Sequence, residues 1–111
     1  MRKLLYIVLF CIPIGVHANT MGGVTAKVTG TGTYDDGSIY IFFDRQISSC
    51  STTSRLDLVA THPAKEQVLS IAMTAFVSGK SVNIHPGSCG GESPVFGTVG
   101  DSYFYLTNAN P

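Results

Sequence analysis

The chain has 111 residues, of which 44% are hydrophobic and 13% charged, and its seven basic residues balance its seven acidic ones. This length predicts one domain with a modest core. Binding to nucleic acid depends on clustered Lys and Arg, so the sparse basic residues argue against a nucleic-acid partner.

The first residues have the pattern of an export signal. Arg2-Lys3 gives a positive start, residues 4–14 are apolar, and Val-His-Ala at 16–18 is a small-x-small cleavage site. We predict a signal peptide over residues 1–18 and a single secreted or periplasmic domain over residues 19–111. Cleavage would leave five basic against seven acidic residues, a net charge of −2. Because the apolar stretch is shorter than the roughly 20 residues of a transmembrane helix, we expect no membrane span.

The cysteines are consistent with export. Cys11 lies in the predicted signal, which leaves Cys50 and Cys89 as the mature pair. In an oxidising compartment such a pair is expected to form a disulfide. A redox-active pair would need close C-x-x-C spacing, and a metal site with His62 and His85 has no recognisable ligand spacing. We therefore predict a structural disulfide, no metal and no cofactor.

The mature chain begins with a predicted β-hairpin. Residues 23–33 alternate in a first strand that is bent at Gly30 and Gly32. Tyr-Asp-Asp-Gly at 34–37 is suited to a turn, and residues 38–44 form a strongly β-prone second strand. Its two faces are both apolar and carry Ile39, Ile41 and Phe43 on one side and Tyr40 and Phe42 on the other.

A loop, a strand and a helix are predicted next. Residues 45–54 are polar and form a loop held by Cys50, and residues 55–60 alternate as a third strand. Pro63 favours the first turn of a helix that extends to Ser78, and Gly79 is placed to end it. We expect the helix to plug the fold with its apolar stripe, which contains Val68, Leu69, Ile71, Ala72, Ala75 and Phe76.

Two strands complete the chain. Residues 80–85 alternate with Val82 and Ile84 inward, and residues 102–107 form an aromatic final strand. With three strands before the helix and two after it, the order predicts a mainly-β fold. The specific expectation is a five-stranded barrel of the OB type, with its helix between strands three and four. That scaffold supports many unrelated functions, so fold alone does not name a ligand.

Catalytic residue patterns are absent from the sequence. The candidates are His62, His85, Asp57 and Glu66, and no nucleophile elbow, paired carboxylate motif or metal signature organises them. His62 is explained as a helix-start residue beside Pro63. His85 is explained as an outward residue at a strand end. We expect a protein that is not an enzyme.

Candidate recognition residues lie around the predicted hairpin. An aromatic face, carboxylates and a forked donor are suited to stack on and hydrogen-bond a sugar, and they are supplied by Tyr34, Asp35, Asp36, Asp44 and Arg45. The alternative is ordinary solvated turn chemistry.

The strands also carry more aromatic residues than one interior can take. A barrel buries one face of each strand, which should leave an apolar outer surface at Tyr40, Phe42, Tyr103 and Tyr105. Such a surface would suit a subunit interface or a ligand platform.

One segment suggests a family. Residues 72–85, Ala-Met-Thr-Ala-Phe-Val-Ser-Gly-Lys-Ser-Val-Asn-Ile-His, resemble the helix-to-strand passage of the OB-fold B subunits of bacterial AB5 toxins, especially the subtilase-cytotoxin and typhoid-toxin type. This resemblance implies a secreted or periplasmic, non-catalytic subunit, commonly a ring of five that binds sialylated or other glycans. The leading hypothesis is thus an exported protein that recognises a glycan or protein partner. The alternative is a monomeric periplasmic inhibitor or accessory protein.

Overall fold

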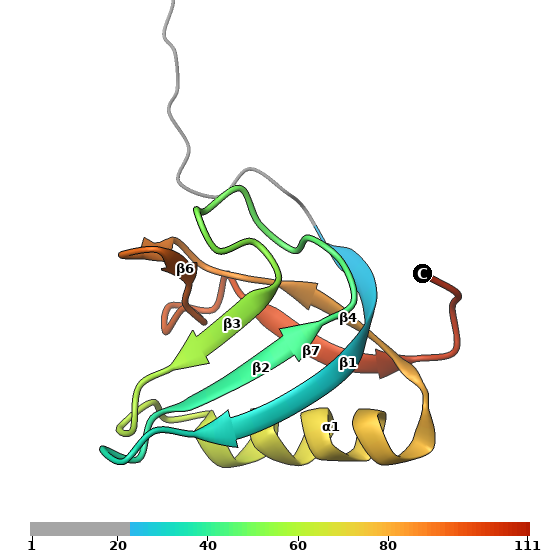
Figure 1. The fold of residues 1–111 in the computed structure, drawn as a ribbon, viewed down its shortest axis with the longest axis horizontal. Coiled ribbons are helices and arrows are strands. Elements are labelled where there is room, and N and C mark those ends of the chain that lie inside the picture. The colour runs from blue at the N-terminus through green and yellow to red at the C-terminus, as the bar shows by residue number, and fades with distance from the viewer. Residues whose placement is uncertain (1–22) are drawn as a thin grey trace, which may run out of the picture.

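A computed structural model describes residues 23–111, so the predicted signal peptide lies outside the described part. The fold is mainly β, as predicted, with one helix and a five-stranded antiparallel sheet in the order β3-β2-β1-β4-β7 (Figure 1). Its strands are β1 (Val24–Thr33), β2 (Ile39–Phe43), β3 (Arg55–Leu58), β4 (Ser81–His85) and β7 (Tyr103–Thr107). Each predicted strand is present within a few residues of its expected bounds.

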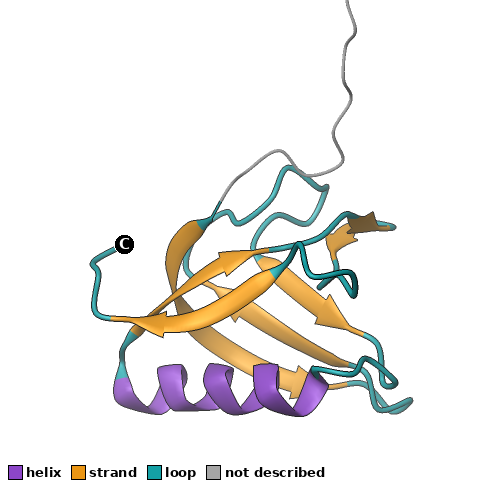
Figure 2. Ribbon diagram, turned by 180° about the vertical axis from the view of Figure 1, so that it is seen from behind, coloured by secondary structure: helices purple, strands orange, loops and turns teal. Residues whose placement is uncertain are grey.

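The long strand β1 is shared by both halves of the sheet. Residues 24–27 pair with β4, whereas residues 28–33 pair with β2. The register shifts between Val28 and Gly30, next to one of the two glycines at which the sequence predicts a bend. β1 therefore curves strongly, and the outer faces of β2 and β7 lie on different flanks of the molecule (Figures 1 and 2).

The sheet is open, which differs from the barrel that the sequence predicts. β3 and β7 form its two edges and do not pair with each other. The segment between β4 and β7 explains this, because Val95 forms a parallel bridge with Asp57, and Phe96 N donates to Asp57 O at 3.2 Å. A single bridge from this segment thus occupies the edge of β3 that β7 would need for closure.

The helix α1 (Lys65–Ser78) lies along the open side of the curved sheet (Figures 1 and 2). It buries Val68, Ala72 and Ala75. It ends at Gly79, whose φ of +74° is the left-handed cap expected from the sequence. The prediction that Phe76 faces the sheet is wrong, because this residue lies at the margin of the apolar stripe and is 54% exposed. The small side chains Ala72 and Ala75 instead let the helix approach the sheet closely.

The core lies between α1 and the inner face of the sheet. Val82 and Ile84 point inward, as predicted, and the alternate residues of β2 join them. The main strand and helix contributors are Ala26, Val28, Ile39, Ile41, Phe43, Leu56, Leu58, Val68, Ala72, Ala75, Val82, Ile84 and Phe104. Among residues 23–111, no helix is long and apolar enough to cross a membrane.

A disulfide joins Cys50 to Cys89, as predicted, with the two Cα atoms 5.7 Å apart. It links the 45–54 loop to a small hairpin formed by β5 (Cys89–Gly90) and β6 (Ser93–Pro94). A backbone hydrogen bond from Thr52 N to Glu92 O, 2.7 Å long, reinforces this link. The loop and the hairpin are thereby fixed beside β3.

Candidate functional site

The five predicted recognition residues fall into two groups. Tyr34, Asp35 and Asp36 lie in the turn before β2, whereas Asp44 and Arg45 directly follow its last residue. β2 has five residues, so four steps of about 3.4 Å separate its two ends by roughly 14 Å. The structure therefore does not bring all five together in one site.

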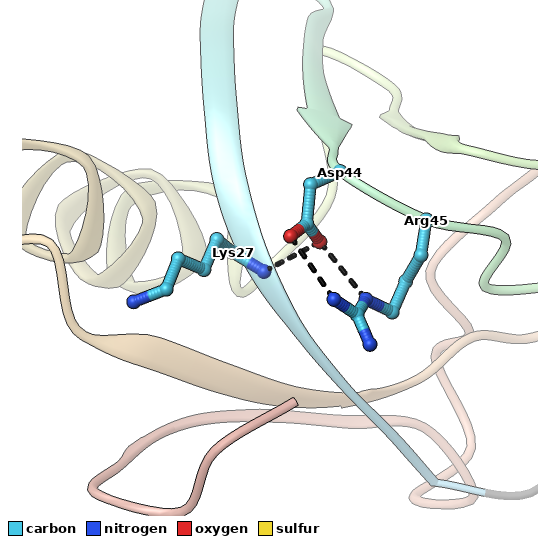
Figure 3. Close-up of polar contacts among 3 residues, drawn as sticks. All are labelled: Lys27, Asp44 and Arg45. Atoms are coloured by element: carbon cyan, nitrogen blue, oxygen red, sulfur yellow. Dashed lines mark hydrogen bonds and ion pairs between the residues drawn. The ribbon is translucent and has the colours of Figure 1, made fainter.

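Asp44 fastens the end of β2 to β1 (Figure 3). Its Oδ1 accepts the backbone N–H of Lys27 at 2.9 Å, and its own N–H donates to Lys27 O at 3.0 Å. Arg45 donates to both carboxylate oxygens, from Nε at 3.1 Å and from Nη2 at 3.2 Å. This side-chain hydrogen bonding from Arg45 holds the pKa of Asp44 below its usual value. Asp44 is thus committed to the fold rather than available to a ligand.

The turn group is partly structural as well. Asp36 accepts hydrogen bonds from Ser38 Oγ at 2.6 Å and Ser38 N at 2.9 Å, which lower the pKa of Asp36. Gly37 has a φ of +89°, and its carbonyl accepts Lys65 Nζ at 3.1 Å, which ties the turn to α1. The turn is therefore held in place, and Tyr34 projects from it with 43% of its surface exposed.

Tyr34 begins a continuous row of rings along β2. The centroids of Tyr34 and Tyr40 are 5.0 Å apart, and those of Tyr40 and Phe42 are 5.3 Å apart in an edge-to-face arrangement. Phe42 is 39% exposed. These three residues form the aromatic row, which lies on the face of β2 opposite the core and confirms that apolar surface is left outside.

Glycines of β1 make room for this row. Gly32 is paired with Tyr40, and Gly30 is paired with Phe42. A Cβ atom at Gly32 would lie 2.6 Å from Tyr40 Cζ, closer than carbon atoms approach, so the ring leans over a backbone that has no side chain. The sequence signal for this arrangement is that Gly30 and Gly32 are two residues apart in the first strand, as are Tyr40 and Phe42 in the second.

β3 supplies charge beside the aromatic row. On the same outer face, Arg55 is paired with Phe42 and Asp57 with Tyr40. Arg55 Nε lies 3.2 Å from Asp57 Oδ1, and Arg55 Nη2 donates to Ser93 Oγ at 2.6 Å. The aromatic row, Arg55 and Asp57 together form what we call the β2–β3 face.

Sequence reasoning did not assign Arg55 to a site. The signal was its alternation, with Asp57, against the buried Leu56 and Leu58. Because Ser93 in the β5–β6 hairpin holds the guanidinium, that hairpin borders the β2–β3 face on one side. The turn that carries Tyr34 borders it near the other end of β2.

A second aromatic group lies on the flank formed by β4 and β7. Tyr103 and Tyr105 stack with centroids 5.8 Å apart, and His85 packs on Tyr103 at 5.3 Å. Both tyrosines are about half exposed, at 42% and 50%. As predicted, the two outer aromatic groups remain outside the core.

Within residues 23–111, no three His, Cys, Asp or Glu side chains lie close enough together to hold a metal ion. The β2–β3 face offers stacking surface from its rings and hydrogen-bonding groups from Arg55 and Asp57. Comparison with known proteins finds no matching family model, no matching curated protein and no matching solved structure for this chain.

Proposed function

We propose that this chain is an exported, non-catalytic binding protein with an OB-type fold, and that its β2–β3 face recognises a carbohydrate. The observation that carries the proposal is the aromatic row, a run of three contacting rings outside the core. Aromatic rings offer large, rigid contact area to the apolar face of a sugar.

The strand order supports the OB-type assignment. A sheet in the order β3-β2-β1-β4-β7, with α1 between the third and fourth main strands, has the strand order of an OB fold. OB folds bind oligosaccharides and oligonucleotides through strands two and three and the loops that border them. That region corresponds to the β2–β3 face of this chain.

The polar groups beside the rings favour sugar over nucleic acid. Asp57 partly neutralises Arg55, and the predicted mature chain has a net charge of −2. A phosphate backbone would need several uncompensated cations. A sugar needs donors and acceptors beside a stacking surface. The Tyr34 hydroxyl can supply both, and Arg55 and Asp57, although they pair with each other, keep about a quarter of their side-chain surface exposed for further hydrogen bonds.

The test is a glycan array followed by calorimetry on the mature protein. Phe42→Ala should weaken binding to an array-selected sugar about tenfold or more, because one exposed ring of the row is lost. Tyr105→Ala is the matched control: its ring is similarly exposed but lies on β7, so affinity should stay within about twofold. If the native protein binds no glycan, the inhibitor or accessory reading becomes the better one.

We further propose that the protein self-associates, for which the AB5 resemblance implies a ring of five. Among the described residues no strand pairs with the outer edge of β7, and that strand contains neither charge nor proline to protect it. Native mass spectrometry of the mature protein measures the subunit number. A strictly monomeric protein would contradict the ring and support the periplasmic inhibitor reading.

A further inference from the structure

A cleft lies where β4 ends, and its lining shares no residue with the β2–β3 face. Its walls are the segment after β4, at Pro86 and Ser88, and the segment before β7, at Thr98 and Asp101, with His85 at the strand end. Its volume of about 450 Å³ is within the range of small-molecule sites. The proposed sugar-binding function makes no use of it.

Hydrogen bonds form the cleft in advance of any ligand. Gly87 N donates to Val95 O at 2.8 Å, and Gly97 N donates to Ser102 Oγ at 2.9 Å. A Cβ atom at Gly87 would lie 2.8 Å from Val95 O, so the two segments approach as closely as backbones can. Binding here would therefore cost little ordering of the loops.

The polar side chains that border the cleft are rich in acceptors without partners. His85 Nδ1 lies 3.1 Å from Pro86 O, and because a carbonyl only accepts, Nδ1 carries the hydrogen. With the hydrogen on Nδ1, Nε2 is the ring nitrogen that can accept a hydrogen bond. Within residues 23–111, the carboxylate of Asp101 makes no hydrogen bond or ion pair. No Lys or Arg is among the described residues that line the cleft.

This set of groups selects a positively charged donor. An anion would meet Asp101 with no compensating cation, whereas an ammonium group has three donors for a carboxylate oxygen, an imidazole nitrogen and a hydroxyl. Hydrogen bonds in which at least one partner is ionised are roughly twice as strong as neutral ones. A neutral alcohol has one donor instead of three and no positive charge to attract the Asp101 carboxylate, so it should bind more weakly.

We propose that the cleft between His85 and Asp101 binds a protonated primary amine, carried by a small molecule or by a lysine side chain. Asp101 provides the charge, and the imidazole of His85 and the hydroxyls of Ser88 and Thr98 are the other polar side-chain groups in the lining. This site shares no residue with the β2–β3 face, so substitutions can test each site without changing the other.

The test is an NMR titration of the ¹⁵N-labelled mature protein at pH 7.5 with n-butylammonium and, as an uncharged match, n-butanol. Butylammonium should shift the amide signals of Gly87, Gly97 and Thr98 saturably, and butanol should bind at least about tenfold more weakly. Nα-acetyl-lysine methylamide and its Nε-acetylated form, as a second pair, show whether a lysine side chain can enter.

Asp101→Asn keeps the shape and removes the charge, so the affinity for butylammonium should fall about tenfold or more. Asp35→Asn makes the same charge change on an exposed turn and should leave the affinity unchanged. Equal binding of amine and alcohol, or undiminished amine binding by Asp101→Asn, would overturn the proposal. So would shifts confined to a different surface, whereas glycan binding by the Asp101→Asn protein should be intact in every case.

Discussion

Replacing His62 with alanine should destabilise the domain more than any other histidine substitution in residues 23–111. His62 is only 8% exposed and lies between the third strand and α1. Its Nδ1 accepts the N–H of Ala64 at 3.0 Å, and its Nε2 donates to Gly97 O at 2.9 Å. The ring also packs on Phe96, with centroids 5.5 Å apart.

The expected loss follows from these contacts. Each hydrogen bond contributes about 0.5–1.5 kcal/mol net, and the buried ring adds packing, so His62→Ala should lower the free energy of unfolding by about 2–4 kcal/mol. For a domain of this size, about 4–8 °C per kcal/mol gives a melting temperature lower by roughly 8–32 °C. His85→Ala is the control, because its ring is only half-buried, packs on Tyr103 and makes one hydrogen bond to its neighbour Pro86, so its loss should cost about 1 kcal/mol.

Two further variants separate the bonds of His62. Asn places an acceptor near the position of Nδ1, and Gln places a donor near that of Nε2, so each should recover part of the loss in urea denaturation. The reasoning would be refuted if His62→Ala and His85→Ala had the same midpoint. It would also be refuted if neither Asn nor Gln were more stable than Ala.

Four other outcomes are expected. The double variant Cys50→Ser/Cys89→Ser should lose up to about 4 kcal/mol in urea denaturation, from the chain entropy of a 39-residue separation, whereas undiminished stability would show that the disulfide constrains nothing. Gly32→Ala should displace the Tyr40 ring and weaken sugar binding in calorimetry, with a smaller effect on the free energy of unfolding than on that of binding. Unchanged affinity would show that the aromatic row does not take part in recognition. Phe76→Ala should change the free energy of unfolding by less than about 1 kcal/mol, since the ring is exposed, and a loss of 3 kcal/mol or more, about that of a buried Phe, would restore it to the core. The lowered pKa of Asp44 gives stability that is present above the unfolded pKa, near 4, and is lost as pH falls through the folded pKa. Asp44→Asn should therefore lower the free energy of unfolding by less than about 1 kcal/mol at pH 7, and the difference from the native protein should vanish in acid. A difference that persists at pH 2 would contradict the electrostatic cause.

Local pattern was enough to predict the main elements of this fold. The alternation around Ile39–Phe43 and the left-handed cap at Gly79 are each set by residues within a few positions of each other. The disulfide followed from counting, because only two cysteines lie beyond the predicted signal peptide. Such features depend on short-range sterics and on simple arithmetic rather than on tertiary context.

Features that depend on distant contacts were not predicted. The side of the helix stripe that faces the sheet was ambiguous, and Phe76 lies outside because Ala72 and Ala75 permit closer packing than a phenylalanine would. Whether the sheet closes into a barrel depends on the path of the long 86–102 segment, and no local pattern in the sequence predicts that path. The pairing of Phe42 with Arg55 likewise required knowledge of the strand register.

The placement of the disulfide has a consequence for limited proteolysis. The bond encloses β3, α1 and β4 in one covalent ring, and it leaves the β1–β2 hairpin and β7 outside. Val59, in the exposed link between β3 and α1, lies inside the ring. A protease that cuts there should yield two fragments that migrate together on a non-reducing gel and separate only after reduction. A cut in the turn at Asp35 should release its N-terminal fragment from the covalent ring in either gel.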